Sequence, residues 1–455
     1  MGKRIYINDG WEFTEKWTDS FADFSDRDED SSDKGTDFSG RDADSPEESG
    51  IQQVRLPHTC RATPYNYFSE DIYQMVCGYR KEFIFPELKG NQRIFLVIGA
   101  CAHSAEVYLN GCRIGEHHSG YTAFRTELTE FLKPGKNRLA VRADTREKQN
   151  IPPFGHVIDY MTYGGLYRGV CLEITGEARM ADVFVKAEVP EDAPLLSNSS
   201  LSGGGISAPD IRKELAEISF TGTIETEFRL DLSAPDASDA LGAGNGASGT
   251  VNGAEGSAEK NLFVRQTAYP YLGESCSSKE ASTAEEARGL KSEAQMFEAP
   301  LSECRREKRK YLSGEKTVFI FRTSLKGAKL WDADSPSLYL VETQLVLREP
   351  AGIGESRSET VVDSNKEVIG FRRSEFRKDG YYLNGRRFPL IGLNRHQSWP
   401  YVGYAMPKSQ QMLDADILKK ELKVNAVRTS HYPQSPDFCR RCDELGLLVF
   451  TEIPG

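Results

Sequence analysis

Two histidines follow consecutive segments that are predicted to be parallel strands. His396 comes just after the predicted strand Leu390–Asn394, and His431 comes just after the predicted strand Ala426–Ser430. Because parallel strands end at one edge of their sheet, we expect both imidazoles on the same rim, where active sites form in α/β barrels. A single such histidine would often be only a loop residue whose hydrogen bonds are made within the protein. Two on neighbouring strands, each with an arginine nearby, predict a shared polar pocket.

Arg428 is expected to need a partner. Strand alternation places Arg428 on one face with Ala426, and an arginine on a buried parallel strand is costly unless it is paired. Glu452, at the end of the next predicted strand Leu447–Ile453, is the natural partner. The pair could only hold the local shape, or it could orient a polar ligand or a metal. The residues leave both readings open.

Other candidates carry weaker signals. Asp159 lies in the loop sequence HVIDYMTYGGLYRGV, where it could be a turn residue or a ligand-binding group. Cys439 and Cys442 form a C-x-x-C on a predicted helix, but no second pair completes a zinc set and the motif does not open the helix, so packing is favoured. The chain contains neither a phosphate-binding glycine loop nor a G-x-S-x-G elbow.

The elements that position these residues alternate between strand and helix. From about Lys366 a hairpin is followed by predicted helices at Ser409–Leu422 and Ser435–Leu445, each preceding a strand. This β-α-β-α-β order predicts parallel strands with right-handed crossovers. Three strands and two helices do not close a barrel, so we expect the chain to stop inside its last domain.

The upstream sequence predicts two all-β domains. Residues 1–178 contain short strands separated by turns such as Asn110-Gly111, which favours an antiparallel sandwich or jelly roll. Residues 179–365 predict a smaller β-sandwich. Two polar segments, 18–50 and about 193–315, are expected to be largely disordered insertions, with one strand near 218–232.

The composition limits the class of protein. The 455 residues carry a net charge of −11, so nothing supports nucleic-acid binding. No apolar run is long enough for a membrane span, and the N-terminus lacks the apolar core of a secretory signal. Nine scattered cysteines indicate free thiols in a reducing compartment. We therefore expect a cytoplasmic protein with no nucleic-acid or membrane partner.

Several motifs, in order, resemble glycoside hydrolase family 2, which includes β-galactosidases and β-glucuronidases. GLNRHQ, VNAVRTSHYPQSP and CDELGLLVFTEIPG resemble the opening of its catalytic barrel. LPHT, EVYLNG and DYMTYGGLYRGV resemble its sugar-binding jelly roll, and KLWDADSPSLY with IGFR resembles its central immunoglobulin-like domain. The resemblance implies a jelly-roll sandwich at 1–178, an immunoglobulin-like sandwich at 179–365, and the first three strands of a (β/α)8 TIM barrel at 366–455.

The resemblance also implies a function. The family's members are retaining β-glycosidases that hydrolyse terminal β-linked sugars, and this sequence is most similar to the β-galactosidase type. Their two catalytic glutamates follow barrel strands four and seven, so both lie beyond Gly455 and this chain alone is expected to be inactive. The alternatives are a non-catalytic carbohydrate-binding β-sandwich protein and an inactive remnant.

Residue by residue, the resemblance assigns a set of substrate-binding positions. They are Asp159, Asn394, Arg395, His396, Arg428 and His431, with Glu452 in support. Glu452 resembles a magnesium-binding glutamate of some β-galactosidases, but the histidine expected two positions later is Pro454 here, so we assign no metal. Mg²⁺ or Na⁺ in the intact enzyme and homo-oligomerisation stay open under the resemblance.

Overall fold

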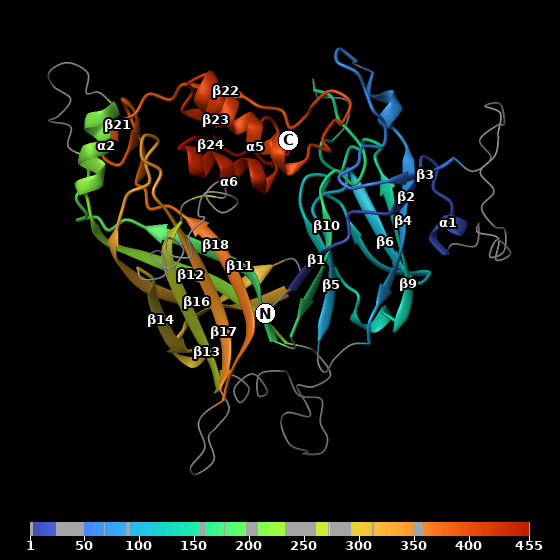
Figure 1. The fold of residues 1–455 in the computed structure, drawn as a ribbon, viewed down its shortest axis with the longest axis horizontal. Helices are drawn as coiled ribbons and strands as arrows, with labels where there is room; N and C mark the ends of the chain where they lie inside the picture. The colour runs from blue at the N-terminus through green and yellow to red at the C-terminus, as the bar shows by residue number, and fades with distance from the viewer. Residues whose placement is uncertain are drawn as a thin grey trace, which may run out of the picture.

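The computed structural model of the chain describes residues 3–23, 50–67, 69–87, 92–154, 160–176, 178–196, 208–232, 261–271, 273, 293–311, 314–348 and 358–454. Two β-rich regions stand beside each other, and the C-terminal region with its helices lies across one end of both (Figure 1). All pairings between strands of the first two regions are antiparallel, whereas the last sheet is parallel.

The first region packs two antiparallel sheets against each other. One sheet has the order β1 (Lys3–Tyr6), β10 (Val170–Thr175), β5 (Arg93–Ile98), β8 (Phe124–Glu127). The other has the order β3 (Ile51–Val54), β2 (Trp11–Thr14), β4 (Val76–Phe85), β9 (Gly135–Asp144), β6 (Ser104–Leu109), β7 (Cys112–His117). Alternating apolar residues from both sheets, such as Phe13, Tyr79 and Leu96, form the core between them. The predicted sandwich is therefore present.

Part of the first polar segment is ordered, which corrects the prediction for 18–50. Helix α1 (Asp19–Asp23) buries Phe21, whose ring lies under the Arg80 guanidinium at 4.2 Å. Gly78 leaves room for it, because a Cβ there would lie 2.9 Å from the rings of Phe21 and Trp17. Phe21 within the segment and Trp17 just before it anchor its start. Residues 24–49 of the segment lie outside the described residues.

The second region is a sandwich of two four-stranded sheets. One has the order β11 (Ala178–Glu188), β12 (Phe220–Leu232), β16 (Gly314–Ala328), β15 (Arg305–Tyr311). The other has the order β14 (Gln295–Pro300), β13 (Leu262–Tyr271), β17 (Leu338–Arg348), β18 (Glu359–Ile369). Strand β18 ends at Ile369, so this sandwich runs slightly past the predicted boundary at 365.

The segment 193–315 contributes more structure than predicted. Besides the expected strand at β12, it supplies helix α2 (Ala208–Glu217) and strands β13, β14 and β15. In β13, Leu262, Val264 and Ala268 alternate into the core, which is the pattern of a half-buried strand. The polar runs on either side diluted this pattern in the average composition. The remaining positions, 197–207, 233–260, 272, 274–292 and 312–313, lie outside the described residues.

The third region places three short parallel strands beside two helices. A small antiparallel sheet of β19 (Ser374–Arg377), β20 (Gly380–Leu383) and β21 (Arg386–Arg387) comes first. The parallel sheet has the order β22 (Gly392–Asn394), β23 (Ala426–Arg428), β24 (Leu448–Phe450), with α5 (Lys408–Asp416) and α6 (Pro436–Leu445) in the connections. A π-helical turn at Ile417–Glu421 continues α5. The sheet is open, and no closed barrel is present among the described residues.

Helix α6 begins and ends where the sequence predicts. The Ser435 hydroxyl accepts a hydrogen bond from the Asp437 amide, Pro436 is the first helical residue, and Gly446 ends the helix in a left-handed conformation at φ 73°. A side chain at Gly446 would also meet the backbone of Ala333 at 2.4 Å. The helix is therefore fixed both locally and against the second region.

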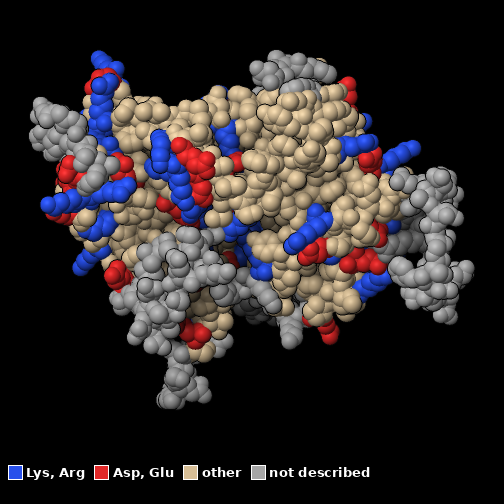
Figure 2. Space-filling model, turned by 45° about the horizontal axis from the view of Figure 1, so that its top comes forward, with Lys and Arg blue, Asp and Glu red and all other residues tan. Residues whose placement is uncertain are grey.

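Charged side chains of both signs are interspersed on the face of the molecule shown in Figure 2. Blue and red side chains lie next to each other around broad uncharged areas. Ion pairs at α5 and α6 include Arg441–Asp416, at 2.8 Å, and Lys420–Asp416, at 2.5 Å. On that face, the described residues form no broad area of one sign.

Candidate functional site

The carboxyl ends of the three parallel strands lie side by side. In register, Asn394 at the end of β22 pairs with Arg428 at the end of β23, which pairs with Phe450 of β24. His396, His431 and Glu452 each follow one of these ends by two or three residues. The centres of the two imidazole rings are 5.3 Å apart. The structure therefore brings both histidines together on one rim.

Glu452 connects Arg428 to His431. Its Oε1 accepts a hydrogen bond from Arg428 Nε at 2.5 Å, and its Oε2 lies 3.3 Å from His431 Nδ1. The hydrogen bond from Arg428 is the main reason that the pKa of Glu452 is lowered from its ordinary value. The predicted Arg428–Glu452 pair is thus present and keeps a carboxylate ionised at the rim.

Arg428 and Glu452 are not buried among the described residues, where the parallel sheet has three strands and is open. The side chain of Arg428 is 43% exposed and that of Glu452 is 29% exposed. Arg428 is the last residue of β23, at the carboxyl end of the strand. Because both groups are open to solvent, the pair can interact with a ligand as well as hold the local shape.

Tyr160 of the first region reaches this rim. Its ring centre lies 5.4 Å from that of His396, 5.3 Å from that of His431 and 5.7 Å from that of Tyr432. One aromatic ring from the sandwich therefore contacts both histidines of the parallel sheet. The site is built by two regions that are far apart in the sequence.

Arg168 and a cluster of tyrosines hold the two regions together. Arg168 Nη2 donates to Gln397 Oε1 at 3.2 Å and to the Pro433 carbonyl at 3.1 Å, and its Nη1 donates to the Tyr121 carbonyl. The rings of Tyr121 and Tyr432 stack with centres 4.4 Å apart. The contacts fix the loops that carry both histidines against the first region.

Arg395 does not point to the rim, which corrects its predicted role in substrate binding. Its guanidinium is buried, where it donates to Asp414 Oδ2 at 2.6 Å and to Gln411 Oε1 at 2.8 Å. It also lies 3.9 Å above the centre of the Phe438 ring. Successive residues after β22 alternate in direction, so Arg395 packs under the helices while His396 faces the rim. Arg395 is a positioning residue.

The other predicted residues divide into two groups. Asn394 is exposed at the end of β22, directly beside Arg428 in the sheet. Asp159 lies outside the described residues, so its placement stays a prediction. Sequence reasoning missed Tyr160, Tyr432 and Arg168, which are adjacent to or near the motifs that it used. Their signal was the density of tyrosines around those motifs.

The chemistry of the rim is recognition of polar groups. Arg428 and the two histidines supply hydrogen-bonding groups that can contact hydroxyls, and Tyr160 supplies an aromatic surface. Glu452 is the carboxylate that the described residues place in this set. In the part of the chain that the structure describes, no three histidine, cysteine, aspartate or glutamate side chains are grouped as a metal site requires. The Glu452 carboxylate is already engaged by Arg428, so the described residues assign no metal to this rim.

The described helices include none that is long and apolar enough to cross a membrane.

Comparison with known families identifies the class. Residues 66–153 match the family model described as "Glycosyl hydrolase 2 galactose-binding domain-like". Residues 375–455 match the model described as "Glycosyl hydrolases family 2, TIM barrel domain". The first match covers strands β4 to β9 of the first sandwich, and the second covers the parallel sheet that carries the histidines. Both matched segments are therefore those of glycoside hydrolase family 2.

Individual relatives agree with this assignment. A β-galactosidase of Thermoanaerobacterium thermosulfurigenes is 35% identical over 458 residues, covering 100% of this chain and 49% of the relative. A β-galactosidase of Thermoanaerobacter pseudethanolicus is 34% identical over 412 residues, covering 90% of this chain and 43% of the relative. The chain thus spans about half the length of the curated relatives that it matches.

A solved structure has the same fold. The β-glucuronidase of Bifidobacterium dentium complexed with coumarin-3-O-glucuronide superposes with a TM-score of 0.67 at 18% sequence identity. The superposition covers 100% of this chain and 62% of the β-glucuronidase. At this identity the likeness concerns the fold.

Proposed function

We propose that the complete gene product is a retaining β-glycosidase of the β-galactosidase type, and that this chain forms part of its sugar-binding wall. The observation that carries the proposal is the meeting of His396, His431 and the Arg428–Glu452 pair with Tyr160 at the ends of the parallel strands. The names of the relatives, β-galactosidases among them, support the substrate class.

In this proposal the rim binds a terminal β-linked sugar. His396, His431 and Arg428 hydrogen-bond to the ring hydroxyls, and Tyr160 contacts the apolar face of the sugar. Contacts to hydroxyls that strengthen as the ring flattens toward an oxocarbenium ion lower the barrier to glycosidic cleavage. Asp159 is proposed to reach the same sugar from the first region.

The chain by itself is proposed to be inactive. A retaining glycosidase needs a nucleophile and an acid/base whose carboxyl groups are about 5–5.5 Å apart. Glu452 is tied to Arg428 at 2.5 Å and is not proposed for either role. The family resemblance assigns both roles to glutamates on later strands of the barrel.

The test compares the purified 455-residue chain with the complete gene product on nitrophenyl β-galactoside and nitrophenyl β-glucuronide. We expect turnover by the complete product, with β-galactoside preferred, and none by the chain. Turnover by the pure chain would contradict its proposed inactivity. No turnover of any β-glycoside by a folded complete product would contradict the enzyme proposal itself.

Further proposals concern the fold and the boundaries of the three regions. The second sandwich is proposed to be immunoglobulin-like, with two antiparallel four-stranded sheets in support. The first region is taken as 1–178, the second as 179–365 and the barrel as 366 onward.

A cytoplasmic location is proposed on the grounds that all eight cysteines in the described residues are free thiols. The complete enzyme is further proposed to form a homo-oligomer and to need no nucleic-acid or membrane partner.

A second candidate is carbohydrate binding without catalysis. It is favoured by the match of residues 66–153 to a galactose-binding domain-like model. Calorimetric titration with methyl β-galactoside distinguishes binding at the rim from binding elsewhere, by comparing the wild-type chain with the His396→Ala and His431→Ala variants. Binding that is lost in both variants would place the sugar at the rim, whereas binding that survives both substitutions would show that the chain holds a saccharide site away from the rim.

A further inference from the structure

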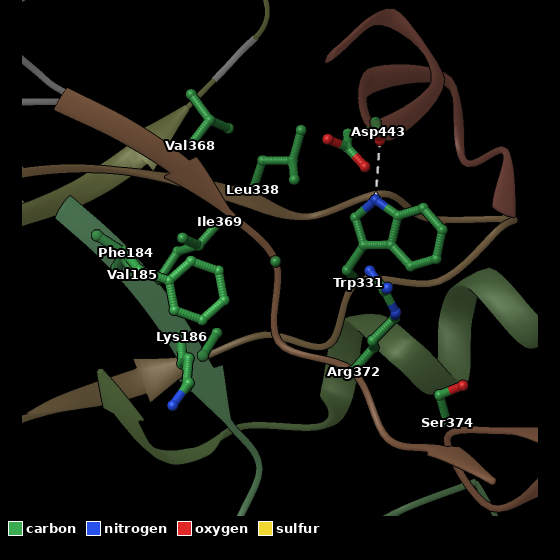
Figure 3. A pocket seen from close by; sticks show the side chains of 12 residues that line it. Phe184, Val185, Lys186, Trp331, Leu338, Val368, Ile369, Arg372, Ser374 and Asp443 are labelled. Carbon is green, nitrogen blue, oxygen red and sulfur yellow. Dashed lines mark hydrogen bonds between the residues drawn. The ribbon is translucent and has the colours of Figure 1, made fainter. Parts of the chain in front are cut away.

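A second pocket lies between the second region and helix α6. It has a volume of about 490 Å³, within the range of small-molecule sites. Strand β11 contributes Phe184, the end of β18 contributes apolar side chains, and α6 contributes Asp443 (Figure 3). Trp331 and Arg372 form the wall between them. None of the rim side chains lines this pocket.

Phe184 presents an aromatic surface that folding alone does not require. Its side chain is 55% exposed, although it is a large apolar residue. The register of β11 against β12 shifts between Ala181 and Phe184, and Asp182 adopts φ 53°. Such bulges redirect the side chains that follow them and are common beside functional sites. The bulge turns the Phe184 ring toward the pocket (Figure 3).

Asp443 provides a carboxylate that the described protein does not satisfy. Its backbone carbonyl accepts a 2.8 Å hydrogen bond from Trp331 Nε1, but no described group donates to its side-chain oxygens. Burial raises the pKa of this carboxyl to about 6, and the charge of Arg372 opposes the shift only in part. Asp443 is partly exposed at the pocket, so a ligand there can donate a hydrogen bond to its carboxylate.

The charges of the pocket select the kind of ligand. The Arg372 guanidinium lies over the Trp331 ring at 5.3 Å, and Lys186 also lines the pocket. The Lys186 ammonium is held by Glu227 at 2.6 Å and by Glu225 at 3.3 Å. Arg372 and Asp443 carry opposite charges, so together they favour neither a cationic nor an anionic ligand strongly. A neutral ligand with hydroxyls can donate to Asp443 and accept from Arg372.

We propose that this pocket is a second saccharide-binding site, which takes a small neutral sugar with its ring against Phe184. The C–H groups of one pyranose face are apolar and suit the negative face of an aromatic ring. The ring hydroxyls then reach Asp443 and Arg372. The site is separate from the rim and does not depend on the proposed glycosidase activity.

The test is calorimetry and saturation-transfer NMR of the 455-residue chain with methyl β-galactoside, methyl β-glucoside and lactose. Phe184→Ala and Asp443→Asn are each expected to weaken binding about tenfold or more, as losing an aromatic contact or a charged hydrogen bond does. Phe184→Tyr should retain saccharide binding. Phe376→Ala, which removes another exposed aromatic at 72% exposure, should not change it. The double variant that combines His396→Ala with His431→Ala removes any contribution of the rim histidines to binding.

The expected result is saccharide binding that persists in the double histidine variant and is lost on changing Phe184 or Asp443. Thermal melts establish that each variant is folded, and Phe184 is exposed enough that its truncation should leave the fold intact. Binding unaffected by both pocket substitutions would overturn the proposal. So would the absence of binding by all three sugars up to tens of millimolar, or binding only of the charged probes acetate or methylammonium.

Discussion

Arg428 Nε donates to Glu452 Oε1 at 2.5 Å across the ends of two neighbouring parallel strands. The same carboxylate lies 3.3 Å from His431. One acidic group therefore fixes a guanidinium and an imidazole on the rim that the first region covers with Tyr160. This arrangement leads to predictions for ionisation, stability and binding.

The ionisation of Glu452 should depend on Arg428. Arg428→Met removes the hydrogen bond that lowers the pKa of Glu452, so that pKa should rise toward the ordinary glutamate value. Because the folded-state pKa is lowered, the pair stabilises the fold above the ordinary pKa and its effect fades as the pH falls through the lowered value. A carboxyl ¹³C NMR titration measures the change. An identical Glu452 titration in both proteins would show that the pair does not form in solution.

Asp443 should make stability depend on pH in the opposite direction. Its pKa is raised from 3.8 to about 6, mainly by burial, so its charge destabilises the fold as the pH rises from about 4 to above 6. The full penalty is on the order of 3 kcal/mol or less at pH 8, from about 1.4 kcal/mol per pH unit. Asp443→Asn should therefore unfold later than the wild type in urea at pH 8 and show little difference at pH 4. The exposed control Asp71→Asn should show neither effect, and equal urea midpoints at pH 8 would contradict the account.

Arg395 should matter for stability more than its nearness to His396 suggests. Arg395→Met removes a buried guanidinium from Asp414 and leaves that carboxylate unpaired, which should cost about 3–5 kcal/mol. Arg395→Lys should recover only part of the lost free energy of unfolding, because an ammonium cannot reproduce the planar fork that contacts Asp414 and Gln411. Urea unfolding measures both. The exposed Arg377→Ala should stay within about 0.5 kcal/mol of wild type, and a similarly small effect at Arg395 would refute the positioning role.

Tyr160 should orient the two histidines. Tyr160→Ala removes the ring that lies 5.3–5.4 Å from both imidazoles and should shift their ¹H–¹³C NMR signals, whereas Tyr160→Phe should keep them close to wild type. Only seven histidines are present, so the signals can be assigned by substitution. Tyr65→Ala changes a tyrosine that is 76% exposed and serves as the control. If Tyr160→Ala leaves both signals in place, the first region does not position this rim.

The sequence predicted those features that depend on local patterns. Ser435, Pro436 and Gly446 set the ends of α6, and the alternation of strands and helices placed His396 and His431 on one rim. The direction of Arg395 was not predictable, because it depends on how α5 and α6 pack under the sheet. The contact of Tyr160 with the histidines joins residues more than 200 positions apart, which no local pattern encodes. Strand β13 was not predicted, because the polar residues on either side of it dominated the average composition of the segment.

The most direct test of the rim is steady-state kinetics of the complete gene product on nitrophenyl β-galactoside. His396→Ala and His431→Ala should each lower kcat/KM by about 10²-fold or more, as the loss of contacts that strengthen in a transition state does, while thermal stability stays near wild type. The exposed His118→Ala should leave kcat/KM unchanged. Values of kcat/KM within twofold of wild type for both rim variants would contradict the account.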